Sequence, residues 1–595
     1  MSPTIGDQEH AGFTIPEFKD DVTSQEAISL LEAEVRKHEN HIAALKTRMN
    51  SFAPISRLPA ELICKIFEVV RQSYALREGS LRWIELSHVC HAWRNLMVHS
   101  PSFLTVLPMD SPLWTKEMIL RSKDASLTVL IDLASFSNVA PVVSTAIPTL
   151  RLMPRIQELK ITGAFRCADD LQRLLDSLPE SAPALETLSL GCENYLTDWP
   201  QSARPREIIL HTRSLRSMER LRSLKATSCR IDWETHLANM PMLTRLTINN
   251  IITSSAPTTT AFWNALKNMG ALQHLQLSKS LPIAGDAPYS NNKVHLPNLK
   301  YLNLRGEPDQ IARFLDGVVL PADVLLDIMC EGTDTRSSVN ALRALSATIK
   351  SEIGSLTARQ PVINGYQIEA DYTHQRPRQA EQFARNYPEY GSLESDLRVL
   401  VTVQHPGLDI GPVPLDDLWT SLFHELPFSK VSNTTLYLEA ALPPVILATT
   451  LGTLPKLESL VIEDRFATNI VKALQQDPPV FPVLSRLKLS SASFRSIDSW
   501  DVPSCTYDVL LECLTTRRKR ELPIRHLTLS GYFPDMTDEK TATLREVVDE
   551  VESILNTFPE PYDDFEDDYE DEDEYDSYES DPYHDGGSMY SYSDS

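Results

Sequence analysis

The densest group of side chains that could bind a metal comprises His88, Cys90 and His91, with Cys64 upstream. Imidazole and thiolate groups are ordinary zinc ligands, and three of them within four residues suggest a zinc site. On a helix, however, side chains one or two positions apart point in different directions, so these groups do not converge on one ion. We therefore predict no metal site and no cofactor.

Motifs of common catalytic and nucleotide-binding sites are missing from the sequence. It contains no Gly-x-Ser-x-Gly turn, no Gly-x-x-x-x-Gly-Lys-Ser/Thr or Gly-x-Gly-x-x-Gly loop, and no His-Glu-x-x-His pair. Glycine is also scarce, at 19 of 595 residues, which is unfavourable for loops that cradle phosphates. We expect a protein that is not an enzyme.

The charge of the chain is unevenly distributed. The net charge is −25, and 16 acidic residues but no Lys or Arg fall between Pro559 and Ser595. This balance argues against general binding to DNA or RNA, which depends on Lys and Arg neutralising phosphates. The run from Arg517 to Arg520 resembles a short nuclear-import patch, and the alternative is a solvated polar loop.

Neither a membrane span nor a secretory signal is predicted. No window has about 20 uninterrupted apolar residues, and the start of the chain lacks a charged head followed by an apolar core. We therefore expect no membrane partner and a cytoplasmic and/or nuclear location.

A helix is predicted from about Ser24 to Phe52. Eight of its positions are spaced 3, 4, 3, 4, 3, 4 and 3 apart, and all but one are apolar: Ile28, Leu31, Val35, His38, Ile42, Leu45, Met49 and Phe52. The helix either docks on its own domain, or it pairs with a second copy or a partner helix. His38, at the midpoint, could set the register or the direction of such pairing.

The next segment predicts a small helical bundle. Its two helices are expected within Ile55–Val70 and Leu81–Met97, with Ser80 as the N-cap of the second. Pro59 suits a first helical turn, and Glu61 suits its positive end. The expected inward residues are Leu62, Ile66, Val69 and Val70 on the first helix and Leu81, Ile84, Val89, Trp93, Leu96 and Met97 on the second. A core of this size is marginal and is usually completed by a neighbouring domain or a partner.

These residues resemble an F-box of the fungal type. The matching positions are Leu58, Pro59, Glu61, Leu62, Ile66 and Phe67 in the first half of the motif and Val89, Cys90, Trp93 and Leu96 in the second. The resemblance covers about Ile55 to Phe103, with a spacer about ten residues longer than usual. It implies binding to the Skp-type adaptor of an SCF-type ubiquitin ligase, and through it to a cullin. The ten residues are the candidate adaptor contacts, with Leu58 and Pro59 foremost.

From about Leu150 the pattern aliphatic-x-x-Leu-x-aliphatic recurs. It starts at Ile156, Leu185, Leu221, Leu243, Leu272, Leu299, Leu457, Leu484 and Ile524, and six of these have a proline two residues earlier. The sequence has only 40 prolines, so this coincidence indicates a true repeat. The spacing resembles that of leucine-rich repeats, which implies a strand and a returning helix in each unit, such as helices near Asp169–Leu178 and Phe262–Lys267.

The predicted fold class is therefore α/β. The expected order is a disordered leader (1–23), an amphipathic or coiled-coil helix (24–53), an all-α F-box-like bundle (54–105), an irregular leucine-rich-repeat solenoid (106–540), a terminal helix (541–558) and a disordered acidic tail (559–595). The solenoid is expected to carry an insertion near 330–430. Within it we predict degenerate repeats at Leu320–Ile328 and Val431–Leu438, a hairpin turn at Asn364-Gly365, and a surface insertion at Glu369–Tyr390.

The resemblance implies a substrate-recruiting subunit of a ubiquitin ligase. The bundle would bind the adaptor, and the strand face of the solenoid would bind a target protein that the sequence does not identify. The alternative is a ubiquitin-independent interaction scaffold, in which the heptad helix and the acidic tail assemble proteins.

Overall fold

The computed structural model describes residues 23–75, 81–192, 208–250, 256–282, 293–322, 324–331, 335–349, 353–362, 365–372, 399–404, 415–437, 442–463, 467–490, 507–531 and 536–555. The predicted leader up to residue 22, the predicted N-cap Ser80 and the acidic tail lie outside the described residues. So do Asn364 and most of the predicted surface insertion.

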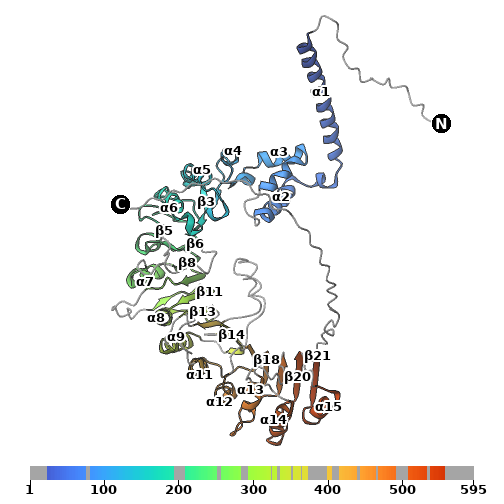
Figure 1. Cartoon of the computed structure of the whole chain (residues 1–595). Coiled ribbons are helices and arrows are strands. Elements are labelled where there is room, and N and C mark those ends of the chain that lie inside the picture. The colour runs from blue at the N-terminus through green and yellow to red at the C-terminus, as the bar shows by residue number, and fades with distance from the viewer. Residues whose placement is uncertain are drawn as a thin grey trace, which may run out of the picture.

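Strands and helices alternate along most of the chain and coil into a curved solenoid, with the strands on its inner side and the helices on its outer side (Figure 1). Within the described residues, seventeen strands form one sheet. They are β1 (Val106–Leu107), β2 (Leu127–Asp132), β3 (Ile156–Gly163), β4 (Thr187–Cys192), β6 (Ser223–Thr227), β8 (Arg245–Asn249), β9 (His274–Ser278), β11 (Tyr301–Gly306), β13 (Leu325–Glu331), β14 (Ile353–Val362), β15 (Gly365–Tyr372), β16 (Val399–Gln404), β17 (Asn433–Tyr437), β18 (Ser459–Glu463), β19 (Arg486–Ser490), β20 (His526–Gly531) and β21 (Glu550–Leu555).

The outer layer consists of short helices. They are α4 (Pro112–Arg121), α5 (Ala140–Leu150), α6 (Ala168–Asp176), α7 (Thr259–Lys267), α8 (Pro308–Gly317), α9 (Thr335–Thr348), α11 (Leu415–Glu425), α12 (Pro444–Thr449), α13 (Ala467–Leu474), α14 (Tyr507–Lys519) and α15 (Asp538–Val547). Two small parallel pairs join β5 (Ile208–Ile209) to β7 (Cys229–Arg230) and β10 (Val294–His295) to β12 (Val318–Val319). Both helices expected from the repeat pattern are confirmed as α6 and α7.

The repeat fixes the register of the sheet. The central leucines of successive units lie opposite one another in parallel strands and are at most 3% exposed: Leu159, Leu188, Leu224, Leu246, Leu275, Leu302 and Leu326. Full burial of each leucine side chain contributes about 1.5–3 kcal/mol, and a slip of one residue would turn the whole row outward. The predicted strands of the repeat units are confirmed, and the predicted degenerate repeats are strands β13 and β17 of the same sheet.

Within the predicted insertion near 330–430, the described strands belong to the main sheet. β13 pairs with β16, β16 with β15, β15 with β14, and β14 with β17, so this part of the sheet runs in reverse chain order. Among the strands that the structure describes, only β15 is antiparallel to its neighbours. The predicted hairpin is confirmed by the pairing of Val362 with Gly365, and Glu369–Tyr372 belong to β15 rather than to a surface insertion.

The carboxyl end also differs from the prediction. A terminal helix over 541–558 is wrong, because α15 ends at Val547 and Glu550–Leu555 form β21 beside β20. The β-branched and apolar residues of this segment extend the sheet by one strand. The basic run is not a polar loop either, since Arg517, Arg518 and Lys519 lie in the last turn of α14.

A long helix, α1 (Ser24–Asn50), precedes the bundle and confirms the predicted helix. It starts with a capping box in which Thr23 accepts a hydrogen bond from the Glu26 amide and Glu26 accepts one from the Thr23 amide. None of its residues is buried. Docking on its own domain is therefore the wrong interpretation for the part of the chain that is described.

The bundle consists of the 3-10 helix Pro54–Arg57, α2 (Ala60–Ala75), the 3-10 helix Leu81–His88, α3 (His91–His99) and the 3-10 helix Pro101–Leu104. The predicted second helix is thus interrupted at Val89 and Cys90, where Cys90 is the extended N-cap of α3. Further short 3-10 turns lie at Leu133–Ser135, Met153–Arg155, Phe165–Cys167 and Leu451–Thr453, and a π-helical turn lies at Trp233–Leu237.

Candidate functional site

The bundle core is built around Phe67. Its ring lies edge-on to Trp93 and Phe103, with centroids 4.9 and 6.0 Å apart. Ile63, on the preceding turn of α2, is also buried, as are Trp83 and Met97 from the second half of the bundle. These residues belong to the same continuous core as Leu104 and Leu107, at the first strand of the solenoid. The solenoid therefore completes the marginal core of the bundle.

The predicted inward face of α2 is wrong by one position. Ile63 and Phe67 face the core, whereas Leu62, Ile66 and Val69 are 45%, 40% and 66% exposed. Val70, the fourth residue predicted to face inward, is half-buried. The two sets are offset by one residue and have the same helical period. The packing of Phe67 against Trp93 and Phe103 determines which set faces the core. Val89, also predicted to face inward, is exposed, and Ile84 is half-buried. Trp83, next to Ile84 in the sequence, is buried. The Leu81 side chain lies outside the described residues.

The ten candidate adaptor contacts divide by exposure. Phe67 is buried and serves the core, and Cys90, Trp93 and Leu96 are half-buried. The exposed members are Leu58, Pro59, Glu61, Leu62, Ile66 and Val89. The structure thus separates core residues from surface residues within a motif where sequence alone left them equivalent.

An apolar stripe follows the start of the bundle and consists of Leu58, Leu62, Ile66 and Val69. Leu62, Ile66 and Val69 are spaced by four and three residues, which places them on one face of α2. Leu58 directly precedes Pro59, whose carbonyl accepts hydrogen bonds from the Leu62 and Ile63 amides at the start of the helix. Val69 was not among the candidate contacts, and its own exposure, 66%, is what places it on the stripe.

A second surface is the concave strand face, formed by strand residues whose side chains alternate with the buried leucines. Its best-defined polar group joins Tyr301 and Asn303 of β11 to Asp327 of β13. Tyr301 Oη donates to Asp327 Oδ2 at 3.1 Å, and Asn303 Nδ2 donates to the same oxygen at 2.6 Å. Burial raises the pKa of the Asp327 carboxyl, and the two donors oppose that rise.

Positive charge lies beside this group. Arg305 and Lys279 both form ion pairs with Glu331, Lys279 at 3.1 Å. His274 of β9 lies next to Tyr301, with ring centroids 6.4 Å apart. Burial lowers the pKa of His274 to about 4, helped by the nearby charges of Arg245 and Lys300, so the imidazole is neutral near pH 7. This part of the surface offers fixed hydrogen-bonding groups.

Neither surface shows a group of metal-binding side chains among its described residues. In the described ranges no three His, Cys, Asp or Glu residues are grouped so that they could hold a metal ion, and this includes His88, Cys90 and His91. No described helix combines the length and the apolar character needed to cross a membrane.

Comparison with known proteins gives little information about this chain. No family model matches the sequence, and no curated protein matches it. Among solved structures, the chain is similar to the crystal structure of the Rad7 and Elc1 complex in yeast, with a TM-score of 0.22 and 15% identity, over 68% of this chain and 83% of that one. At these values the likeness carries no argument about fold or function.

Proposed function

We propose that the protein is a substrate-recruiting subunit of an SCF-type ubiquitin ligase, in which the bundle binds a Skp-type adaptor and, through it, a cullin. The observation that carries this proposal is the apolar stripe. Leu58, Leu62 and Ile66 of the stripe match the first half of the F-box motif, and the whole stripe faces solvent while the bundle core is filled without it.

The stripe is unfavourable for a bundle that acts alone. Leu62, Ile66 and Val69 expose apolar surface whose burial is worth about 25 cal/mol per Å². Contiguous exposed apolar residues on a soluble protein mark interaction sites. Glu61, beside the stripe at the start of α2, supplies a charged edge that could fix the orientation of a partner.

In this proposal the solenoid holds the target. The concave strand face presents polar side chains at regular spacing on a rigid sheet, as the Tyr301, Asn303 and Asp327 group illustrates. The chain itself would perform no bond chemistry. Its contribution would be to raise the effective concentration of a bound target near the conjugating enzyme and to orient that target.

The test is co-purification of the full chain with the Skp-type adaptor. The full chain is needed because the bundle core continues into the solenoid. We expect Leu62→Asp combined with Ile66→Asp to abolish adaptor binding, and Leu58→Ala combined with Pro59→Ala to weaken it. The matched control is Leu120→Asp on α4, a leucine that is 73% exposed and lies outside the motif, and it should bind as the wild type does.

Circular dichroism of each variant distinguishes loss of contact from loss of fold. A folded wild-type chain that does not bind the adaptor would overturn the proposal and leave the ubiquitin-independent scaffold as the leading function. Equal loss of binding with Leu120→Asp would show that added charge, and not the stripe, is responsible.

A further inference from the structure

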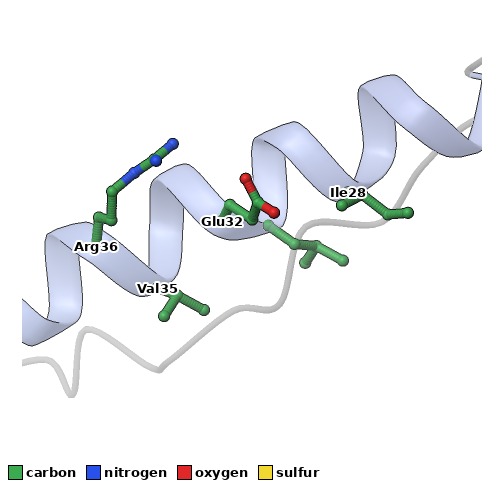
Figure 2. A pocket seen from close by; sticks show the side chains of 5 residues that line it. Ile28, Glu32, Val35 and Arg36 are labelled. Carbon is green, nitrogen blue, oxygen red and sulfur yellow. The ribbon is translucent and has the colours of Figure 1, made fainter. Parts of the chain in front are cut away.

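The helix α1 carries an apolar seam, and none of the residues in this helix is buried. The helix has 27 residues and is therefore about 40 Å long. The seven apolar residues of the heptad pattern are between 37% and 70% exposed. Ile28 and Val35 point to one side of α1, with Glu32 and Arg36 along their edge (Figure 2), and the helix projects away from the curved solenoid (Figure 1).

The spacing of the seam is the same in both directions. Because the steps of 3, 4, 3, 4, 3, 4 and 3 residues form a palindrome, two antiparallel copies bring every seam residue opposite another seam residue. Leu31 then meets Met49, Val35 meets Leu45, and His38 meets Ile42. Ile28 meets Phe52, just beyond the end of the helix. A parallel pair would instead place His38 against His38.

The charges beside the seam favour the antiparallel direction. In that arrangement Glu32 of one copy faces Lys46 of the other, and Glu34 faces Arg48, so symmetry gives four attractive contacts. Within a single helix Glu34 contacts Lys37 at 2.9 Å and His38 at 3.3 Å, and Arg48 lies over the Phe52 ring at 5.0 Å. These local contacts are exposed and are worth little.

The parallel direction has no attractive flanking contact. There Glu34 would face Glu39, and His41 would face Lys46. The antiparallel pair has its own unfavourable contacts at the centre, where Glu39 faces Glu39 and His41 faces His41. Four attractive contacts offset these two, and the opposed helix dipoles add to the preference.

We propose that two copies of this chain associate through α1 in the antiparallel direction. The inference does not depend on adaptor binding, since it rests on α1 and not on the bundle. It has a geometric consequence. The two bundles follow opposite ends of the paired helices, so they and the apolar stripe on each are held about 40 Å apart or more.

The first experiment measures the mass of the full chain by sedimentation at concentrations up to about 100 μM. We expect a species of twice the 67.0 kDa of one chain. Leu31→Asp, on the seam, should weaken association by about tenfold or more. Leu30→Asp is the matched control, because Leu30 is adjacent and 54% exposed but off the seam, and it should leave the dimer intact. A wild-type chain that stays monomeric, or equal losses in both variants, would overturn the proposal.

The second experiment tests direction by charge reversal. In the antiparallel pair, Glu34→Lys places a lysine opposite Arg48 of the other copy at both symmetry-related contacts, so association should weaken several-fold. In a parallel pair the new lysine would face Glu39, and association should become stronger. Arg48→Glu should also weaken the dimer. Both changes in one chain restore opposite charges, so the double variant should associate about as well as the wild type. Tighter association with Glu34→Lys alone would overturn the antiparallel direction.

Discussion

The region before residue 100 and the solenoid differ in the exposure of their apolar side chains. Of the 21 large apolar residues that are exposed in the described parts of the chain, 14 lie before residue 100, in a region much shorter than the solenoid. In the solenoid nearly every strand leucine is covered by the next repeat and by the outer helices.

This difference follows from architecture. A solenoid buries its apolar residues by stacking, because each repeat covers the one before it. A lone helix has no neighbour, and a small bundle has room for only a few inward residues, so the remaining apolar residues stay at the surface. The exposed residues of the first region are thus the ones available to other chains, while those of the solenoid maintain its shape.

The largest expected effect tests the boundary between core and stripe within α2. Phe67→Ala removes the centre of the bundle core and should lower the free energy of unfolding by about 3–5 kcal/mol. Ile66→Ala, one residue away on the stripe, should cost about 1 kcal/mol or less because that side chain is already 40% exposed. Denaturation followed by tryptophan fluorescence checks both variants, since Trp83 and Trp93 lie in this core. Similar losses would mean that no such boundary exists.

The next effect belongs to the solenoid and depends on pH. The folded pKa of His274, about 4, lies below the 6.5 of an unperturbed histidine, so the native state binds fewer protons than the unfolded state between these values. Stability should therefore fall as pH drops from 6.5 towards 4, by roughly 3 kcal/mol in total from this residue. His274→Gln should flatten that part of the stability profile.

The comparison uses the slope of unfolding midpoints against pH, which is insensitive to any packing loss at neutral pH. His295→Gln changes an exposed histidine on β10 and serves as the control, with the slope of the wild type. A wild-type slope in His274→Gln would contradict the assignment of the acid sensitivity to a buried, neutral imidazole.

A somewhat smaller effect separates two adjacent arginines of α14. The guanidinium of Arg517 is buried and donates to the carbonyl oxygens of Val480, Phe481 and Leu522 at 2.9–3.1 Å. Arg517→Met leaves these acceptors without a donor and should cost about 2–3 kcal/mol. Arg518→Met removes one exposed hydrogen bond to Glu546 and should cost under about 1 kcal/mol. Thermal unfolding measures both, and a larger loss for Arg518→Met would be the contrary result.

Arg517 also shows where sequence analysis reaches its limit. Four adjacent basic residues look alike in a sequence, and only the turn of the neighbouring repeat determines which one is buried. The same holds for α2, where Leu62 and Ile63 begin two equally periodic faces and a distant aromatic cluster selects one. In contrast, the repeat strands were predictable because proline, aliphatic residues and leucine recur at fixed local positions.

The reversed strand order from β13 to β17 was beyond prediction for a related reason. Its strands pair with segments tens of residues away, and no local pattern specifies which of several short apolar segments becomes the neighbour. The candidate site followed the same rule. The motif located the segment that we propose to bind the adaptor, but the division of its ten residues into core and surface required the packing of the whole bundle.

The smallest expected effect compares two helix caps. Thr23 caps α1 by accepting from the Glu26 amide, and Thr258 caps α7 by accepting from the Ala261 amide at 3.2 Å. Losing either cap costs about 1 kcal/mol. In α7 the buried Phe262 holds the turn in place, whereas α1 has no buried residue and relies on local signals. Hydrogen exchange should therefore accelerate in the first turn of α1 with Thr23→Ala, and change little in α7 with Thr258→Ala.

Measuring this hydrogen exchange at several protein concentrations also tests the proposed pairing of α1. If two copies pair through α1, the partner helix supplies the packing that α1 lacks, and the exchange of its amides should slow as concentration rises, in Thr23→Ala as in the wild type. Exchange in α7 should not depend on concentration, because its packing lies within one chain. Fast exchange in α1 at every concentration would mean that its seam meets no second copy, and the contrast between a region completed by other chains and a region complete in itself would then rest on the apolar stripe alone.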